Sequence, residues 1–344
     1  RKLLLRKYYK QKNWFNYVYK KIIYNFIMLK KIFLKLSRSV IKLLLPFLYT
    51  FLVKIKANRR VINFLNDKSF YSNSYYDFSN LIKKSLNNKK IIALDIGAQG
   101  GFNSDDFFHK RYNQFFEPIL VEPISGEANK LMATNKYVIN KAFWSEKTKK
   151  KINLLGNRLG SSSVYQPDIN LFDLHQIKKK DYKNFDITKI IEVDCDTISS
   201  SLLNLKINSL DYLKIDTQGS ELEILKGIGE YRPLLLKIEG HIHSMYQGVP
   251  GWNDLIDYLY KLNYIVVDWK GIGSHATRTP AELDMILIPN FNNSLGKDLI
   301  KNNESKFTSL LLIFGQINLL KIVSNKLNFK SSNEITTYED RFFY

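Results

Sequence analysis

The chain has 344 residues, a formal net charge of +20 at pH 7 and a hydrophobic content of 45%. This length exceeds one average domain and supplies enough apolar residues for a sizeable core. The single cysteine, Cys195, excludes an intramolecular disulfide and a zinc site built from several cysteines. Because one cysteine is typical of a reducing compartment, we expect a cytoplasmic protein in which Cys195 packs within a strand.

Basic residues are concentrated at the N-terminal end. Residues 1–60 contain 17 Lys or Arg and no Asp or Glu, whereas the remaining 284 residues hold 35 basic and 32 acidic side chains. Apolar residues recur at helical spacing over residues 22–36, with lysines between them, which predicts a basic and hydrophobic helical arm over residues 1–66. We expect this arm to lie on an anionic membrane surface and make the protein peripheral. Two alternatives are a cap on the following domain and contact with nucleic acid.

A second apolar stretch in the arm covers residues 43–53 and contains Pro46. A helix that spans a bilayer needs about 20 apolar residues. The stretch is too short, so the sequence predicts no transmembrane segment there.

Residues 91–101 join an apolar run containing Asp95 to a turn with Gly97, Gly100 and Gly101. A continuous apolar run is typical of a strand buried on both faces, and the glycines let backbone N–H groups approach a ligand. A second apolar run ends in Glu122, 25 residues after Gly97. An acid at this spacing can accept hydrogen bonds from both ribose hydroxyls of an adenosine. The glycine spacing does not match the NAD fingerprint, which favours a different adenosine ligand.

Further elements follow by the same reasoning. Strands are expected near residues 91–96, 118–122, 137–142, 211–216 and 233–239, with a final pair over residues 264–269 and 284–289. Helices are expected near residues 104–111, 125–135, 220–227 and 252–262. Residues 143–198 interrupt the alternation, with possible extra strands at residues 151–155 and 190–194. Alternating strands and helices predict an α/β fold with a doubly wound, mostly parallel sheet.

The domain boundaries are expected in segments rich in turn-forming residues. These are residues 66–74 and 290–296, which place a catalytic domain over residues 75–290. Beyond it, residues 291–344 should hold one closing helix, starting near Phe307, and a loose tail over residues 331–344.

The most specific pattern lies in residues 212–227. A short apolar run ends in Asp216, Gly219 follows in a turn, and a short amphipathic helix then stops at Gly227. Open α/β sheets bind ligands at the carboxyl ends of their strands. Asp216 is therefore expected in an active site.

These segments together resemble the FkbM family of S-adenosylmethionine-dependent methyltransferases. Residues 95–101 are similar to the family's D-V-G-A-N-x-G, with Gln99 where Asn is usual, and Glu122-Pro123 matches its E-P. Residues 214–227 are similar to its K-I-D-[VT]-[EQ]-G-[AS]-E…L-K-G signature, nearly position for position. Weaker matches are Ala142, Ser161-Ser162-Ser163, Asp196 and Arg232-Pro233…Glu239. The resemblance covers roughly residues 86–290.

The resemblance implies a Rossmann-like class I methyltransferase fold. Its sheet has seven strands, and the last strand is antiparallel and inserted beside the fifth. The implied cofactor is S-adenosylmethionine, and the implied reaction is O-methylation of a hydroxyl on a sugar, glycan or glycolipid acceptor. We therefore assign cofactor binding to six residues: Asp95, Gly97, Gln99, Gly101, Glu122 and Ala142.

Catalysis requires an acceptor held in line with the methyl group and a group that removes its proton. We assign these roles to Asp216, Glu239 and His241, which follow or end the predicted fourth and fifth strands. A histidine with a pKa near 6.5 is a better base at neutral pH than a carboxylate near 4. His241 and His243 alternate, so only one can face the cavity, and we favour His241. Nothing in the spacing of these acids and histidines is diagnostic of Mg²⁺, so no metal ligand is assigned.

Two other functions deserve comparison. A methyltransferase acting on nucleic acid or protein could use the same fold, but the chain has no Pro-Pro for a base-methylating loop, and its catalytic region is nearly neutral. A membrane-associated adaptor that binds the cofactor without catalysis is the other alternative. The combination of Gly97, Glu122 and Asp216 argues against it.

Overall fold

The computed structural model describes residues 77–329 except 106, 176 and 273–278. These residues belong to one compact unit, Tyr76–Asp340. The basic arm predicted over residues 1–66 and the tail predicted over residues 331–344 lie outside the described residues. None of the helices within the described ranges combines the length and apolar character needed to cross a bilayer.

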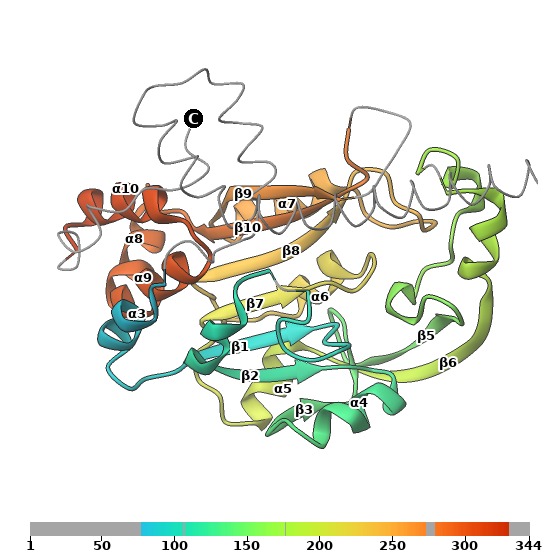
Figure 1. The fold of residues 1–344 in the computed structure, drawn as a ribbon, viewed down its shortest axis with the longest axis horizontal. Coiled ribbons are helices and arrows are strands. Elements are labelled where there is room, and N and C mark those ends of the chain that lie inside the picture. Colours follow the sequence, from blue (N-terminus) through green and yellow to red (C-terminus); the bar gives the residue numbers. More distant parts are fainter. Residues whose placement is uncertain (1–76, 106, 176, 273–278, 330–344) are drawn as a thin grey trace, which may run out of the picture. The chain divides into compact units, whose positions relative to one another are not determined.

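A seven-stranded sheet with the order β3-β2-β1-β7-β8-β10-β9 forms the centre of this unit (Figure 1). Its strands are β1 (Ile91–Ile96), β2 (Phe116–Val121), β3 (Tyr137–Ile139), β7 (Tyr212–Ile215), β8 (Leu235–His241), β9 (Tyr264–Ile272) and β10 (Glu282–Pro289). The first five pair in parallel, whereas β10 is antiparallel to both β8 and β9. This arrangement confirms the predicted fold class, including the inserted antiparallel last strand.

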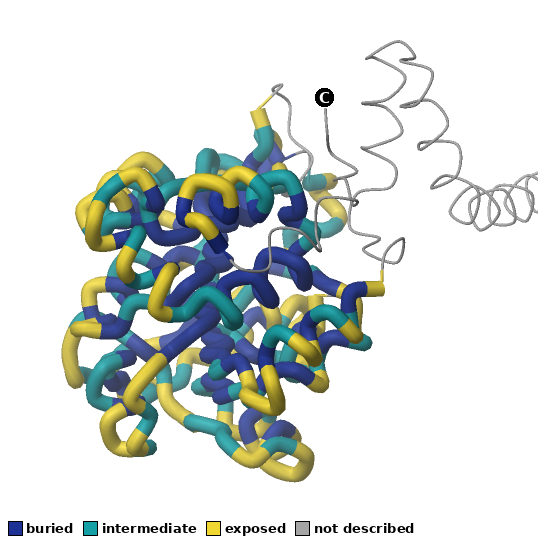
Figure 2. Tube along the Cα trace, turned by 90° about the vertical axis from the view of Figure 1, so that its left-hand side faces the viewer, coloured by how far each residue is buried: buried dark blue, intermediate teal, exposed yellow. Residues whose placement is uncertain are grey.

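Helices cover the two faces of the sheet, and alternate side chains of each strand face different helices. Leu94 and Ile96 of β1 pack in a core with α5 (Ile198–Asn204), α6 (Glu221–Lys226) and α7 (Trp252–Lys261). Ile91 and Ala93 pack in a second core with α3 (Ser79–Leu86) and the C-terminal helices. The remaining helix, α4 (Ser125–Met132), lies beside β3. Figure 2 shows the buried chain running through the middle, with exposed segments around it.

The segment between β3 and β7 forms a second sheet of three strands in the order β4-β6-β5. It contains β4 (Ala142–Phe143), β5 (Thr148–Leu155) and β6 (Ile187–Asp196), and β5 is antiparallel to β6. Both extra strands predicted in this segment are confirmed, and each is longer than predicted.

The helix predicted near residues 104–111 is wrong. The described residues after the glycine turn form bends, turns and then a 3₁₀ helix at Lys110–Phe115. Asn103 has a φ of +55°, and its side-chain amide donates to Phe108 O at 2.9 Å and to Asn113 Oδ1 at 3.2 Å. These side-chain bonds stabilise a compact loop in place of a helix.

The C-terminal region also differs from the prediction of one closing helix. It forms α8 (Ser294–Asn302), α9 (Glu304–Ile313) and α10 (Ile317–Leu327), and Gly315 at φ +71° separates the last two. Inside the expected linker at residues 290–296, the Asn293 side chain caps α8 by accepting from Gly296 N at 3.0 Å. The aromatic ring of Phe314 lies 5.3 Å from that of Tyr212 in β7, so these helices share the core of the sheet.

Candidate active site

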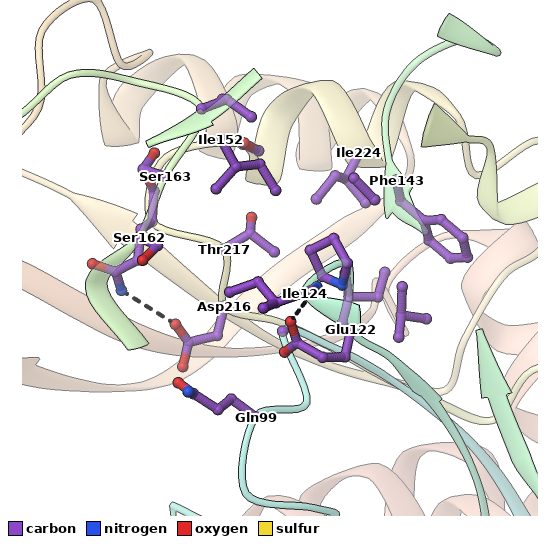
Figure 3. A pocket seen from close by; sticks show the side chains of 18 of the residues that line it. Gln99, Glu122, Ile124, Phe143, Ile152, Ser162, Ser163, Asp216, Thr217 and Ile224 are labelled. Atoms are coloured by element: carbon purple, nitrogen blue, oxygen red, sulfur yellow. Dashed lines mark hydrogen bonds between the residues drawn. The ribbon is translucent and has the colours of Figure 1, made fainter. Parts of the chain in front are cut away.

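A cavity of about 220 Å³ lies at the carboxyl ends of β1, β2 and β7 (Figure 3). Five of the predicted residues line it: Gly97, Gln99, Glu122, Ala142 and Asp216. In Figure 3 the carboxylates of Glu122 and Asp216 and the amide of Gln99 lie on one side, and the apolar side chains of Ile152, Phe143 and Ile224 lie on the other. The cavity therefore has one polar and one apolar wall.

The glycine turn after β1 holds the end of this strand close to β7. Gly97 has a φ of +81°, and its N–H and that of Ala98 each donate to Val121 O at 3.1 Å. A Cβ at position 97 would lie only 2.0 Å from the backbone oxygen of Asp216. Glycine is therefore required at position 97 both by the backbone angle and by the approach of β7.

Glu122 follows β2 directly and is only 4% exposed. Its Oε1 accepts from Ile124 N at 2.8 Å, while Asn140 Nδ2 donates to its backbone oxygen at 2.9 Å. Burial raises the pKa of the Glu122 carboxyl to about 7, although the Ile124 hydrogen bond partly opposes the shift. Hydrogen-bond donors in a ligand would therefore stabilise the ionised form of this buried carboxyl group.

Asp95 and Gly101 are two predicted cofactor-binding residues that are not among the described residues lining the cavity. Asp95 is buried in β1 and accepts from Lys214 Nζ at 3.1 Å. The same ammonium donates to Gly97 O at 3.3 Å and lies 3.8 Å from Asp216 Oδ2. Asp95 thus orients Lys214, which joins the ends of β1 and β7.

Lys214 was part of the recognised motif, but its role was not predicted from the sequence. Burial by itself would lower the pKa of Lys214, but Asp95, Asp216 and Asp105 outweigh it and hold the pKa above the usual range. The Lys214 side chain therefore stays a buried cation that lines the cavity beside Asp216.

Gln218 connects the cavity to the residues behind it. Its Nε2 donates to Glu239 Oε2 at 2.9 Å and to Asp216 Oδ1 at 3.4 Å. Its backbone oxygen accepts from Ser163 Oγ at 2.7 Å. The Tyr246 hydroxyl lies 3.0 Å from Gln218 Oε1 and 2.6 Å from Ser161 O. These bonds tie the cavity-lining segment at residues 159–164 to the turn after β7.

Sequence reasoning missed some of these contacts. The serines at 161–163 carried a weak signal through the family motif, whereas nothing in the sequence pointed to Tyr246. Cys195, expected to be a packing residue in a strand, is buried in β6 and also lines the cavity.

Glu239 and His241, the other two predicted catalytic residues, are not among the described residues that line the cavity. Both are buried in β8, and their side chains meet Glu221 and Glu282. Burial, together with Asp216 and other nearby acids, holds the pKa of the Glu239 carboxyl well above its usual range. The structure thus places Asp216 at the cavity and the other two one layer behind it.

Comparison with known proteins identifies the family. No curated protein matches the chain. The sequence model of the methyltransferase FkbM domain matches residues 95–266, which is half of the chain. The matched segment begins at Asp95 and includes the glycine turn, Glu122 and the whole segment from Lys214 to Gly227. From this match, and from the sheet order and cavity that the same residues form, we conclude that the chain belongs to the FkbM methyltransferase family.

Proposed function

We propose that the protein is an S-adenosylmethionine-dependent O-methyltransferase that acts on a hydroxyl of a sugar, glycan or glycolipid. The family supports methyl transfer and implies S-adenosylmethionine as donor. The observation that carries the proposal is the buried Glu122 carboxylate, which lines a cavity beside the Gly97 turn. This is where an α/β sheet binds an adenosine through its ribose.

The residues of the cavity fit such a donor. Glu122 Oε1 already accepts from Ile124 N, and the remaining acceptor positions of the carboxylate suit the two ribose hydroxyls. The apolar wall, which includes Phe143 and Ile224, suits an adenine ring, and Gln99, which also lines the cavity, is the residue that we expect to bond the methionine portion. When bound, S-adenosylmethionine would supply a methyl group activated by its sulfonium.

Asp216 is the residue that we propose on the acceptor side. Its side chain is 30% exposed and lines the cavity, and Gln218 and Lys214 fix its position. The carboxylate would accept a hydrogen bond from the acceptor hydroxyl and receive its proton as the C–O bond forms and the C–S bond of the donor breaks, with S-adenosylhomocysteine as the leaving group. The catalytic roles of Glu239 and His241 stay predictions.

The acceptor class rests on the family resemblance, and membrane contact through residues 1–60 belongs to the same proposal. Incubation with radiolabelled S-adenosylmethionine and carbohydrate or glycolipid extracts tests the proposed acceptor class. A methyl ether on a hydroxyl survives mild alkali, whereas a methyl ester on a carboxylate does not. Label in protein or nucleic acid alone would contradict the proposed acceptor.

Replacing Glu122 with Ala should weaken binding of S-adenosylmethionine and S-adenosylhomocysteine at least about tenfold. The loss of two charge-assisted hydrogen bonds, each worth about 1.5–3 kcal/mol, is the reason. Calorimetry measures the effect. Glu117→Ala is the matched control, because Glu117 lies at the other end of β2, is paired with Lys136 and is not among the described residues lining the cavity. Equal affinities in the two variants would exclude Glu122 as the ribose ligand.

Binding should also depend on pH. The pKa of Glu122 is about 7, so the carboxylate that accepts both hydroxyls predominates above this pH and is protonated below it. Affinity for S-adenosylhomocysteine should therefore fall about tenfold from pH 8 to pH 6, as the ionised fraction falls. Calorimetry across this range should show a flat profile for Glu122→Gln, and a wild-type profile equally flat would contradict the assignment.

A further inference from the structure

Three buried carboxylates surround the His241 imidazole behind the cavity. Glu221 begins α6, Glu239 and His241 lie in β8, and Glu282 begins β10. All four residues are buried, and His241 is only 3% exposed. Acids in such a place either stay protonated or need a partner for their charge.

Two carboxylate oxygens, atoms of a kind that binds metal ions, lie near Nε2 of His241. Glu221 Oε2 and Glu239 Oε2 each lie 3.8 Å from this nitrogen. The three ligand atoms lie within 4.8 Å of one another. Two ligands about 2.1 Å from a tetrahedral ion lie about 3.4 Å apart. The two separations of 3.8 Å therefore need to close by about 0.4 Å around an ion, and the two carboxylates must also approach each other.

The polar atoms around the His241 ring are not all satisfied within the described part of the chain. Neither of its ring nitrogens has a hydrogen-bond partner there, and Glu282 Oε1 has none either. Buried polar side chains are nearly always satisfied, so Nε2, the ring nitrogen that does not face Glu282, points to a partner other than the described residues.

Glu282 lies on the opposite side of the ring, with its Oε1 3.8 Å from Nδ1 of His241. In protein metal sites, a carboxylate commonly accepts from the second nitrogen of a metal-bound histidine and fixes the ring orientation. A proton on Nδ1 leaves the lone pair of Nε2 free for a cation. A small approach of Glu282 to Nδ1 would form this bond and leave Nε2 free for a metal.

The nearby lysines are already paired with other acids. Lys237 Nζ lies 2.7 Å from Asp105 and 3.0 Å from Asp284, while Lys214 pairs with Asp95. Among the described residues, the ion-pair contacts of Glu221, Glu239 and Glu282 are with His241 alone. The carboxyl groups around His241 are thus left without a lysine or arginine partner in this part of the chain.

The carboxylates are also held in place. Glu221 Oε1 accepts from Thr217 N at 2.8 Å, from Thr217 Oγ1 at 3.0 Å and from Gly219 N at 3.2 Å. These bonds leave Oε2 facing His241. Glu239 accepts from Gln218 Nε2, as described above. The triad is thus oriented by its surroundings, as a binding site for an ion requires.

We propose that Glu221, Glu239 and His241 bind one divalent transition-metal ion, and that Glu282 orients the imidazole. An imidazole with two carboxylates suits Zn²⁺ or Mn²⁺ better than Mg²⁺ or Ca²⁺, which prefer oxygen ligands alone. The ion would fix Glu239 and, through Gln218, the position of Asp216 at the cavity. This site does not depend on the identity of the methyl acceptor or on methyl transfer itself.

The test is a titration of the full-length chain, freed of metal with a chelator, with Mn²⁺ and Zn²⁺. Electron paramagnetic resonance and calorimetry should show one ion per chain, bound in preference to Mg²⁺, and pulsed measurements should detect an imidazole nitrogen bound directly to Mn²⁺. Glu282→Gln should weaken binding about 10–100-fold, and His241→Asn should weaken it more. His243→Asn, at the neighbouring histidine, is the matched control and should bind as wild type does.

The outcomes separate the alternatives. Absence of binding by folded wild-type protein, or bound Mn²⁺ without a nitrogen ligand, overturns the proposal. So does a His241→Asn variant that loses turnover but keeps its metal affinity, because the imidazole would then act as the predicted base. If this variant does not fold, as judged by circular dichroism, the test relies on the wild-type protein alone. Detection of a nitrogen bound to Mn²⁺ then decides whether the imidazole is a metal ligand.

Discussion

Replacing Asp216 with Asn should reduce methyl transfer about 10²–10⁴-fold, the usual contribution of a positioned proton acceptor. The amide has nearly the same shape as the carboxylate but cannot take a proton from the acceptor hydroxyl. Donor affinity, measured by calorimetry with S-adenosylhomocysteine, should change much less than turnover. Release of labelled product over time gives the turnover.

Asp186→Asn is a suitable control, because Asp186 is exposed at the end of a 3₁₀ helix and is not among the described residues lining the cavity. Its turnover should equal that of wild type. If Asp216→Asn also has normal turnover, the carboxylate does not accept the proton, and His241 becomes the residue to test next.

Replacing Gly97 with Ala should lower the free energy of unfolding by about 2–6 kcal/mol and abolish donor binding. A residue with a Cβ is strained at a φ of +81°, and the new carbon would lie 2.0 Å from Asp216 O. Backbone strain of about 1–3 kcal/mol and overpacking of about 1–3 kcal/mol combine in this estimate. The melting temperature should fall by roughly 5–15 °C, as measured by circular dichroism.

The matched control is Gly126→Ala in α4, where an added Cβ meets no atom within 4 Å. Alanine favours a helix over glycine by about 0.5–1 kcal/mol, so this variant should be as stable as wild type or slightly more stable. A Gly97→Ala protein with wild-type stability and donor affinity would show that β1 and β7 can separate without loss of the site.

The central strands could be predicted because each of their sequences contains an apolar run. The apolar runs of β1, β2, β7 and β8 lie within two residues of their predicted bounds, since strands buried on both faces need apolar side chains throughout. The loop after β1 could not be predicted in this way. The helix predicted there is replaced by a loop, because the hydrogen bonds of Asn103 reach as far as ten residues ahead.

In the candidate site, too, residues that follow strands could be predicted, whereas contacts between loops could not. Gly97, Glu122 and Asp216 follow strands directly, so the sheet brings them together and their positions could be predicted. Gln218 and Tyr246 meet only because the loop after β8 folds back over the turn after β7. A contact between two irregular segments leaves no periodic pattern in either one, so sequence reasoning missed it.

The position of β10 between β8 and β9 affects how the protein reaches its fold during synthesis. β8 is complete at His241, but its neighbour β10 is complete only at Pro289. At about 5–20 residues per second, roughly 2–10 s pass between the two. Throughout that interval one edge of β8 lacks its partner, and β9 has no strand to pair with. Open strand edges are templates for other chains, so the nascent protein exposes these edges to aggregation until its last strand emerges.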